Sequence, residues 1–177
     1  MSSDSHREEI SEDISACPSC GHPLQLLTFT EDIPYFGLVM QSSFSCEHCG
    51  WRFTDISSVE EKEGSEYTMN FGAEDMTVRI VKSSFCTIQI PELGILVEPG
   101  PASQGYISNI EGILYRMREA TKTAVRWGNE EQKKRGRFVL KQILSLTKGE
   151  MRATLILHDP QGYSAIISEK ALRLPIA

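Results

Sequence analysis

Two short cysteine motifs constrain this chain more than any other feature. Residues 17–21 read CPSCG and residues 46–50 read CEHCG, so each motif places two sulfurs at one tight turn. Two such pairs give the tetrahedral four-thiolate cage that a structural Zn²⁺ prefers. The glycine after each pair suits a turn, because glycine adopts positive φ at no steric cost. We therefore predict one structural zinc ion, with the ligands Cys17, Cys20, Cys46 and Cys49.

The spacing of the pairs predicts a zinc ribbon over residues 17–58, since the long intervening segment suits two hairpin arms better than a short helical finger. Disulfides are disfavoured because no signal peptide is visible, which indicates a reducing compartment, the cytoplasm. The spacing does not separate zinc from rubredoxin-type iron. His22 and His48 are alternative ligands, but four thiolates already complete the shell and both histidines fall on exposed turn positions.

Composition bounds the function classes. The chain has 177 residues, 40% hydrophobic and 24% charged, which allows a small metal domain beside a larger one. No apolar run approaches the roughly 20 residues of a membrane helix, so we expect no membrane partner. The formal net charge of −6 argues against bulk nucleic-acid binding.

The chain divides into four segments. Residues 1–16 are polar and acidic, which predicts a disordered tail before the ribbon. Residues 59–64 are short and charged, which indicates a linker. Residues 65–177 form the main domain, in which short β-type segments flank a helical hairpin at about 103–148. The predicted fold class is mainly β with a helical insertion (α+β), and the body is sandwich-like or barrel-like.

Within the body, hydrophobic phase predicts which side chains are buried. From Met76 to Lys82 residues alternate, with Met76, Val78 and Ile80 on one face. The next strand has Cys86 in phase with two isoleucines, so we interpret Cys86 as a small buried residue rather than a reactive thiol.

The helical hairpin carries its own start signals. Ser108 and Glu111 match a capping box, with Ser108 as N-cap of the first helix. Asn129 is the predicted cap of the second helix, after a stop at Gly128. Gly136 lies inside that second helix, where glycine costs up to about 1 kcal/mol relative to alanine.

These residues resemble the ZPR1-type zinc-finger family, whose unit is a zinc ribbon followed by an "A" domain. The resemblance covers residues 17–167, and Tyr163 stands where the family usually has Asn. Besides the two cysteine motifs, it rests on IPYF at 33–36, KSS at 82–84, IPEL at 90–93, EPG at 98–100, EG at 111–112 and DPQGYS at 159–164.

The resemblance implies fold and function together. The A domain would be a double-stranded β-helix with a helical hairpin insertion. The protein would be a non-enzymatic, chaperone-like partner of the elongation-factor GTPase that delivers aminoacyl-tRNA. A chain with one unit resembles archaeal members, and it would have no small-molecule substrate.

Two surfaces are candidate contacts for such a partner. The ribbon tip between the arms carries two aromatic residues, which are either ribbon core or an exposed contact. The second helix carries the chain's main basic cluster. Aromatic and arginine side chains anchor interfaces well. The candidate partner-binding residues are Tyr35, Phe36, Lys133, Lys134, Arg135 and Arg137.

Two other function classes are weaker. The same basic cluster permits a nucleic-acid-binding zinc ribbon, although a solvated helix face explains it as well. An enzyme is disfavoured because a four-thiolate shell leaves zinc no open position and no phosphate-binding glycine motif occurs. Acidic residues at turns and helix starts, together with His158, do not form a metal-ligand set for the body.

Overall fold

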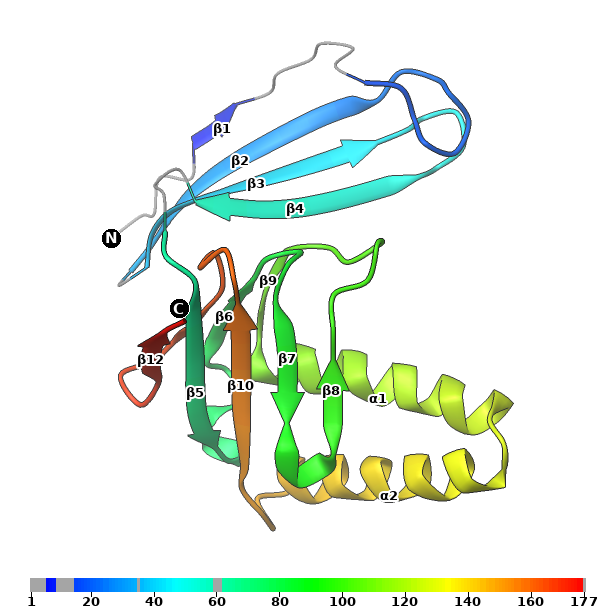
Figure 1. Ribbon diagram of the computed structural model, residues 1–177, viewed down its shortest axis with the longest axis vertical. Helices are drawn as coiled ribbons and strands as arrows, with labels where there is room; N and C mark the ends of the chain where they lie inside the picture. Colours follow the sequence, from blue (N-terminus) through cyan, green and yellow to red (C-terminus); the bar gives the residue numbers. More distant parts are fainter. Residues whose placement is uncertain (1–5, 9–14, 35, 59–61, 177) are drawn as a thin grey trace.

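The computed structural model describes residues 6–8, 15–34, 36–58 and 62–176. The chain has two parts, a long N-terminal sheet and a body of two further sheets with a pair of helices (Figure 1). The two parts follow the predicted order of ribbon and body.

The N-terminal part is an antiparallel sheet in the order β1-β2-β3-β4. Its two longest strands pair along their full length, from Gln25 opposite Ser45 to Ile33 opposite Gly37. They are the two hairpin arms expected between the cysteine pairs. The strands are β1 (His6–Glu8), β2 (Gln25–Ile33), β3 (Gly37–Ser45) and β4 (Arg52–Ser58).

The structure differs at one place from the prediction of a disordered tail over residues 1–16. His6–Glu8 forms a strand that pairs antiparallel with β2, so these three residues belong to the sheet. An edge strand exposes a row of unpaired backbone groups, and β1 covers that edge of β2 from Thr28 to Thr30. The other tail residues up to 14 lie outside the described residues, as do 59–61 of the expected linker.

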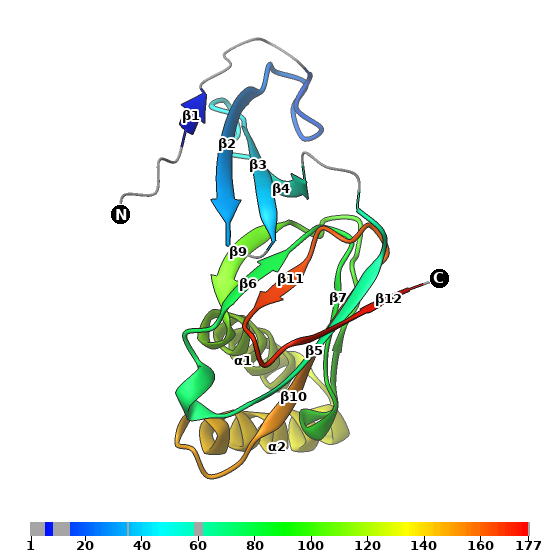
Figure 2. The same cartoon turned by 90° about the vertical axis from the view of Figure 1, so that its left-hand side faces the viewer.

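The body consists of a five-stranded sheet, β12-β5-β10-β7-β8, and a three-stranded sheet, β11-β6-β9. Figure 2 shows the three strands of the smaller sheet lying side by side at the centre of the body. The strands are β5 (Ser65–Phe71), β6 (Arg79–Lys82), β7 (Thr87–Ile90), β8 (Ile95–Val97), β9 (Tyr106–Asn109), β10 (Ala153–Asp159), β11 (Ala165–Ile167) and β12 (Leu172–Pro175).

Most of these strands match the sequence prediction, but β6 is shorter than expected. It begins at Arg79 because Ala73–Asp75 form a 3-10 turn and the Val78 N–H donates to the Asp75 carbonyl at 3.0 Å. Strands β9 and β12 were not predicted at all.

Both faces of β6 are covered. Ile80 is buried in the main core of the body, with Met76 and Val78 packed against that core as the alternation predicted. Val81 points the other way and is also buried, because it packs under the ribbon beside Ile33. A strand with two apolar faces is typical of an internal layer.

The helices α1 (Ile110–Trp127) and α2 (Glu130–Thr147) form the predicted hairpin. Asn129 caps α2 as expected, since its side chain accepts from the Gln132 N–H at 2.9 Å. The Gln132 side-chain oxygen in turn accepts from the Asn129 N–H, which completes a capping box. Among the described helices, none is both long and apolar enough to cross a bilayer.

The predicted cap of α1 was wrong by one residue. Asn109, not Ser108, is the N-cap, and its side-chain oxygen accepts from the Gly112 N–H at 2.8 Å. Ser108 cannot take this role because it is still paired with Ile80 in the β6–β9 ladder. The hairpin therefore starts at Ile110, seven residues after its expected start at 103.

Gly136 has a packing role inside α2. A Cβ at this position would lie 2.4 Å from Cγ2 of Val125 on α1. The missing side chain therefore lets the two helices approach closely, which offsets the weaker helix propensity of glycine.

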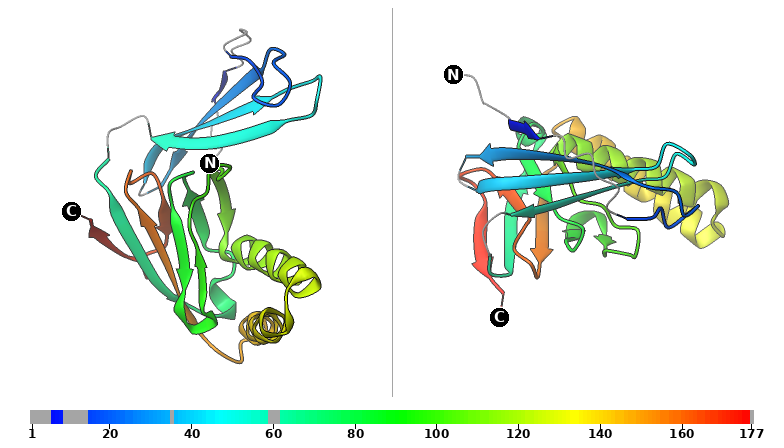
Figure 3. Two further views of the ribbon diagram at one scale, coloured as in Figure 1. Left: turned by 45° about the vertical axis from the view of Figure 1, so that its right-hand side comes forward. Right: turned by 90° about the horizontal axis from the view of Figure 1, so that it is seen from above.

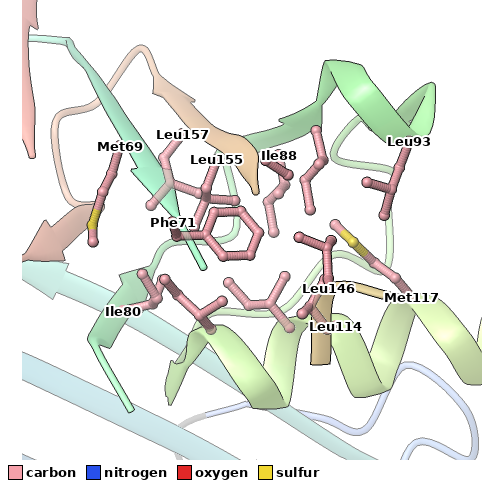
Figure 4. Packing of buried hydrophobic residues seen from close by; sticks show 14 of the residues in the cluster. Met69, Phe71, Ile80, Ile88, Leu93, Leu114, Met117, Leu146, Leu155 and Leu157 are labelled. Carbon is pink, nitrogen blue, oxygen red and sulfur yellow. The ribbon is translucent and has the colours of Figure 1, made fainter. Parts of the chain in front are cut away.

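The main core lies between the five-stranded sheet and the helical hairpin (Figure 4). In β10 every second residue is fully buried, beginning with Ala153, so one face of the strand points into the core. Fully burying a large aliphatic or aromatic side chain stabilises the fold by about 1.5–3 kcal/mol. Core members include Phe71, Ile80, Ile90, Ile113, Leu114, Leu146, Leu155 and Leu157.

Cys86 is buried, with 0% of the residue exposed, as its spacing from the following isoleucines predicted. Burial also raises the pKa of its thiol to about 12. We expect thiol reagents at pH 8 to label Cys86 in the folded, zinc-loaded protein at least about a hundredfold more slowly than in the denatured chain. Peptide-level mass spectrometry measures this rate, and rapid labelling of the folded protein would show that the assigned strand face is wrong.

The ribbon docks on the three-stranded sheet of the body through a small apolar cluster and several polar contacts (Figure 3). The Gly105 N–H donates to the Thr54 carbonyl at 3.0 Å. A Cβ on Gly105 would lie 2.5 Å from the backbone nitrogen of Ile56, so only glycine allows this close approach. Arg79 and Glu31 form an ion pair across the same boundary at 2.6 Å.

Candidate metal centre

The two cysteine motifs fold into equivalent turns. The Cys17 N–H donates to the His22 carbonyl at 2.8 Å, and the Cys46 N–H donates to the Trp51 carbonyl at 2.9 Å. In each turn the glycine after the second cysteine donates back to the first cysteine's carbonyl, at 2.8 and 2.9 Å. These glycines have φ values of 74° and 75°, the left-handed conformation predicted from their positions.

The four sulfurs converge at one point. Sγ of Cys17 lies 3.6 Å from Sγ of Cys49, and Sγ of Cys20 lies 3.5 Å from Sγ of Cys46. All four sulfurs lie within 4.8 Å of one another. Zinc–sulfur bonds of about 2.3 Å in a tetrahedron place sulfurs about 3.8 Å apart, so the cage fits a zinc ion. The same separations exceed the roughly 2.05 Å of a disulfide bond, and all five cysteines are free thiols.

The crowded sulfurs affect each other's protonation. The backbone N–H of Trp51 lowers the pKa of Cys49 to about 7. At Cys20 the backbone at His22 acts in the same direction, but desolvation and the three neighbouring sulfurs outweigh it and raise the pKa to about 12. Four thiolates so close together need a cation, and bound Zn²⁺ supplies one when the thiols release their protons.

His22 and His48 lie on the exposed side of the metal centre. Their rings stack with centroids 3.6 Å apart and an angle of 7° between the planes. With Cys20 the two histidines form a second group whose ligand atoms lie within 4.8 Å of one another, but Cys20 already belongs to the four-sulfur cage. The stack instead joins the two cysteine turns, and a small apolar cluster with Leu24 supports the sulfurs from the other side.

A second polar cluster is buried in the body, where segments of the KSS and DPQGYS motifs meet. The Asp159 carboxylate accepts from the hydroxyl of Ser83 at 2.7 Å and from that of Ser164 at 2.5 Å. Its other oxygen accepts from the Gln161 N–H at 2.9 Å. The Ser83 N–H donates to the Ser164 hydroxyl at 2.9 Å, which ties β6 to the turn after β10. We therefore interpret these motif residues as structural, and call the hydrogen-bonded group of Ser83, Asp159, Gln161 and Ser164 the buried latch.

Glu92, an acidic residue at a turn, and His158 are used in local bonding. Glu92 accepts from the backbone and hydroxyl of Thr154 at 3.0 and 2.8 Å. His158 pairs with Glu66 at 3.2 Å on the opposite side of β10 from the core. Within the part of the chain that the structure describes, the possible metal-binding groups all lie at the cysteine turns.

The candidate partner-binding residues lie in two separate places. Phe36 is half-buried against the apolar cluster under the ribbon, and the Lys62 ammonium lies 3.3 Å from its ring centroid. Tyr35 lies outside the described residues. On α2, Lys134, Arg135 and Arg137 are exposed, and Arg135 donates to the Gly94 carbonyl at 3.2 Å. Lys133 is half-buried and pairs with Glu130 at 2.9 Å.

The structure adds aromatic residues to the hairpin that sequence reasoning missed. Trp127 ends α1 at the hairpin tip and is 77% exposed, with the Arg126 guanidinium 5.3 Å from its ring. Phe138 on α2 is 55% exposed beside the basic residues. Both residues fall outside the helical spacing of the buried apolar residues, and this offset could have marked them as exposed in the sequence.

Comparison with known proteins matches both parts of the chain. Residues 9–63 match the ZPR1 zinc-finger domain, and residues 74–173 match the ZPR1 jelly-roll domain. The described geometry agrees with both, since the first match holds the four-sulfur cage and the second holds the two-sheet body.

Relatives match most of the chain. A ZPR1-like protein of Methanocaldococcus jannaschii is 42% identical over 157 residues, which covers 86% of this chain and 79% of that protein. The human zinc finger protein ZPR1 is 31% identical and covers 94% of this chain, but only 37% of its own length is matched. The fission yeast zinc finger chaperone zpr1 is 31% identical over 85% of this chain and 34% of its own length.

The four cysteines therefore hold a structural zinc ion, and the jelly-roll body carries a helical hairpin. The domain matches and the archaeal relatives agree with one ribbon and one jelly-roll domain in this chain. The chain belongs to the ZPR1 family of zinc-finger proteins.

Proposed function

We propose that this protein is a chaperone-like interaction module for the elongation-factor GTPase that delivers aminoacyl-tRNA. The fission yeast relative, named a zinc finger chaperone, supports the general activity. The choice of client rests on the resemblance of the sequence motifs to the family. On this proposal the protein acts in the cytoplasm, where such a factor works, and it turns over no nucleotide itself.

The helical hairpin is the observation that carries the proposal. It projects from the body on the side away from β12, and Trp127 lies at its exposed tip (Figure 1). A projecting element on a rigid two-sheet body can reach between the domains of a partly folded client. Tryptophan and arginine are the side chains that most often dominate binding energy at interfaces.

Charge distribution favours an acidic protein surface as the hairpin's target. Lys134, Arg135 and Arg137 are exposed on α2, while the chain as a whole carries a formal charge of −6. A local basic patch on an acidic molecule steers binding to one face and disfavours generic anionic polymers.

The alternative function is nucleic-acid binding by the ribbon. Residues 17–58 contain a single basic side chain, Arg52, and four acidic ones: Glu31, Asp32, Glu47 and Asp55. Binding to nucleic acid depends on neutralising phosphates with lysine and arginine, so this surface is poorly suited to it. The charge pattern therefore favours the protein-binding function.

The test is capture of the elongation factor during its refolding from denaturant. We expect the wild-type protein to retain the factor, and the double variant Lys134→Glu/Arg137→Glu to lose at least about tenfold in apparent affinity, equal to about 1.4 kcal/mol. Trp127→Ala should have a comparable effect. A matched double variant, Lys148→Glu/Arg173→Glu, has the same change in net charge at exposed positions away from the hairpin tip and should bind as wild type.

The possible results distinguish a wrong choice of client from a wrong choice of binding surface. If wild-type protein never retains the factor, the client is wrong. If the factor is retained equally by all variants, the client stands and the hairpin is not the contact. Salt-sensitive retention of generic RNA instead would favour the alternative function.

A further inference from the structure

A cavity of about 680 Å³ lies where the ribbon, the loop between β8 and β9, and helix α1 meet. Residues 98–105 of that loop extend from β8 toward the ribbon (Figure 1), and residues 102–105 line the cavity. Ligand sites in proteins typically have volumes of about 300–1,000 Å³ and often lie between structural units. Neither the zinc centre nor the exposed face of α2 contributes to this cavity.

The polar side of the cavity is cationic. Lys82 and Arg116 both line it near the Tyr106 ring: the ammonium lies 5.6 Å and the guanidinium 4.3 Å from the ring centroid. Thr54 and Ser103 add hydroxyl groups to the lining. Among the described residues, no aspartate or glutamate lines the cavity, although acidic residues outnumber basic ones in the chain.

Lys82 is the unusual member of this group, because it is only 5% exposed and forms no ion pair within the described structure. Its ammonium donates to the Ser83 carbonyl at 2.8 Å, to the Ser103 hydroxyl at 3.2 Å and to the Gln104 carbonyl at 3.3 Å. All three acceptors are uncharged, and the two longer bonds go to the loop that lines the cavity. Burial lowers the pKa of Lys82, opposed by the Cys86 thiol and the carboxylates of Asp159 and Asp55.

A buried ammonium held by neutral acceptors gains strongly from a direct anionic partner, because charge–charge attraction rises as water is excluded. The Asp159 carboxylate is bonded to Ser83, Ser164 and Gln161, and within the described structure it makes no ion pair with the Lys82 ammonium. Arg116 is exposed and lines the cavity, so a bound anion can reach its guanidinium without displacing an ion pair within the described structure.

The cavity also has an apolar lining, contributed by Ile88 and Val97 from the sheet and by Ile113 and Met117 from α1. A ligand that fills the cavity therefore needs an anionic end and an apolar body. We propose that this cavity binds a small organic anion, a carboxylate or a phosphate carried on an apolar or aromatic group.

The test is an NMR titration of the zinc-loaded, full-length protein with phenyl phosphate. Phenylacetate tests the carboxylate form, inorganic phosphate tests the charge alone, and phenol tests the apolar body alone. We expect phenyl phosphate or phenylacetate to shift amide signals around the cavity, such as those of Gly105, Ile107 and Ala120. Inorganic phosphate and phenol should each bind at least about tenfold more weakly than the better of the two complete probes.

Two arginine variants on α1 provide the matched comparison. Arg116→Gln removes a cation from the cavity lining at an exposed position, so the fold should persist, and binding should weaken about tenfold. Arg118→Gln removes an equally exposed arginine that does not line the cavity, and it should leave binding unchanged. The proposal is overturned if neither complete probe shifts the cavity signals, if phenol binds as well as both, or if the two variants behave alike.

Discussion

Replacing Cys46 with serine is expected to unfold the ribbon while the jelly-roll body stays folded. The variant loses one of four zinc ligands, and binding energy at structural zinc sites is on the order of 10 kcal/mol. Apart from the metal, the ribbon has two small apolar clusters, around Leu24 and around Ile33, which cannot replace that energy. The body keeps its own large core between the five-stranded sheet and the helices.

Two-dimensional NMR of the variant measures this directly. Amide signals from residues 15–58 should collapse to unfolded positions, and signals from the body should remain dispersed. Removing zinc from wild-type protein with a chelator should give the same result. Cys86→Ala is the matched control, because it removes the one cysteine outside the metal cage and should leave the ribbon and its zinc in place. A folded ribbon in Cys46→Ser, or loss of the body together with the ribbon, would contradict the assignment.

The second large effect is expected at the buried latch of the body. Asp159→Asn keeps the side-chain shape but replaces one acceptor oxygen with an NH₂ donor. The Asp159 oxygens receive bonds from the hydroxyls of Ser83 and Ser164 and from the Gln161 N–H. In one orientation the new NH₂ group faces the Gln161 N–H, and in the other both hydroxyls lose their acceptor. We expect the free energy of unfolding of the body to fall by about 2–3 kcal/mol.

Chemical denaturation followed by circular dichroism measures this loss, with Asp32→Asn as the control. Asp32 is exposed on the ribbon, and surface substitutions of this kind usually change stability by no more than about 0.5 kcal/mol. If Asp159→Asn and Asp32→Asn denature at the same midpoint, the latch does not contribute to stability.

The metal centre was predictable because its determinants are local. Each turn is fixed by five consecutive residues, and the positive φ of Gly21 and Gly50 follows from their place after the second cysteine. The helical hairpin was predictable for the same reason, since the apolar periodicity and the cap at Asn129 lie within the segment. The N-cap of α1 was missed because pairing of Ser108 with β6, a long-range contact, decides where the helix starts.

Features assembled from distant segments were not predictable. Strand β12 was missed because its residues are largely exposed and its only described pairing is with β5, about a hundred residues earlier. The cavity beside Lys82 has lining residues from the ribbon, the body and α1, and no periodic pattern connects them. The sequence left open whether Phe36 is ribbon core or an exposed contact, and its packing against a cluster that includes Val81 of the body decides for partial burial.

The recovery of active elongation-factor GTPase during refolding tests the central claim, zinc-dependent chaperone-like activity, most directly. Denatured factor is diluted into buffer with wild-type protein, with Cys46→Ser, or with no addition, and guanine-nucleotide binding by the refolded factor is measured. The account predicts a higher yield with zinc-loaded wild type and a yield with Cys46→Ser close to that of buffer alone. An equal yield in all three reactions would contradict it.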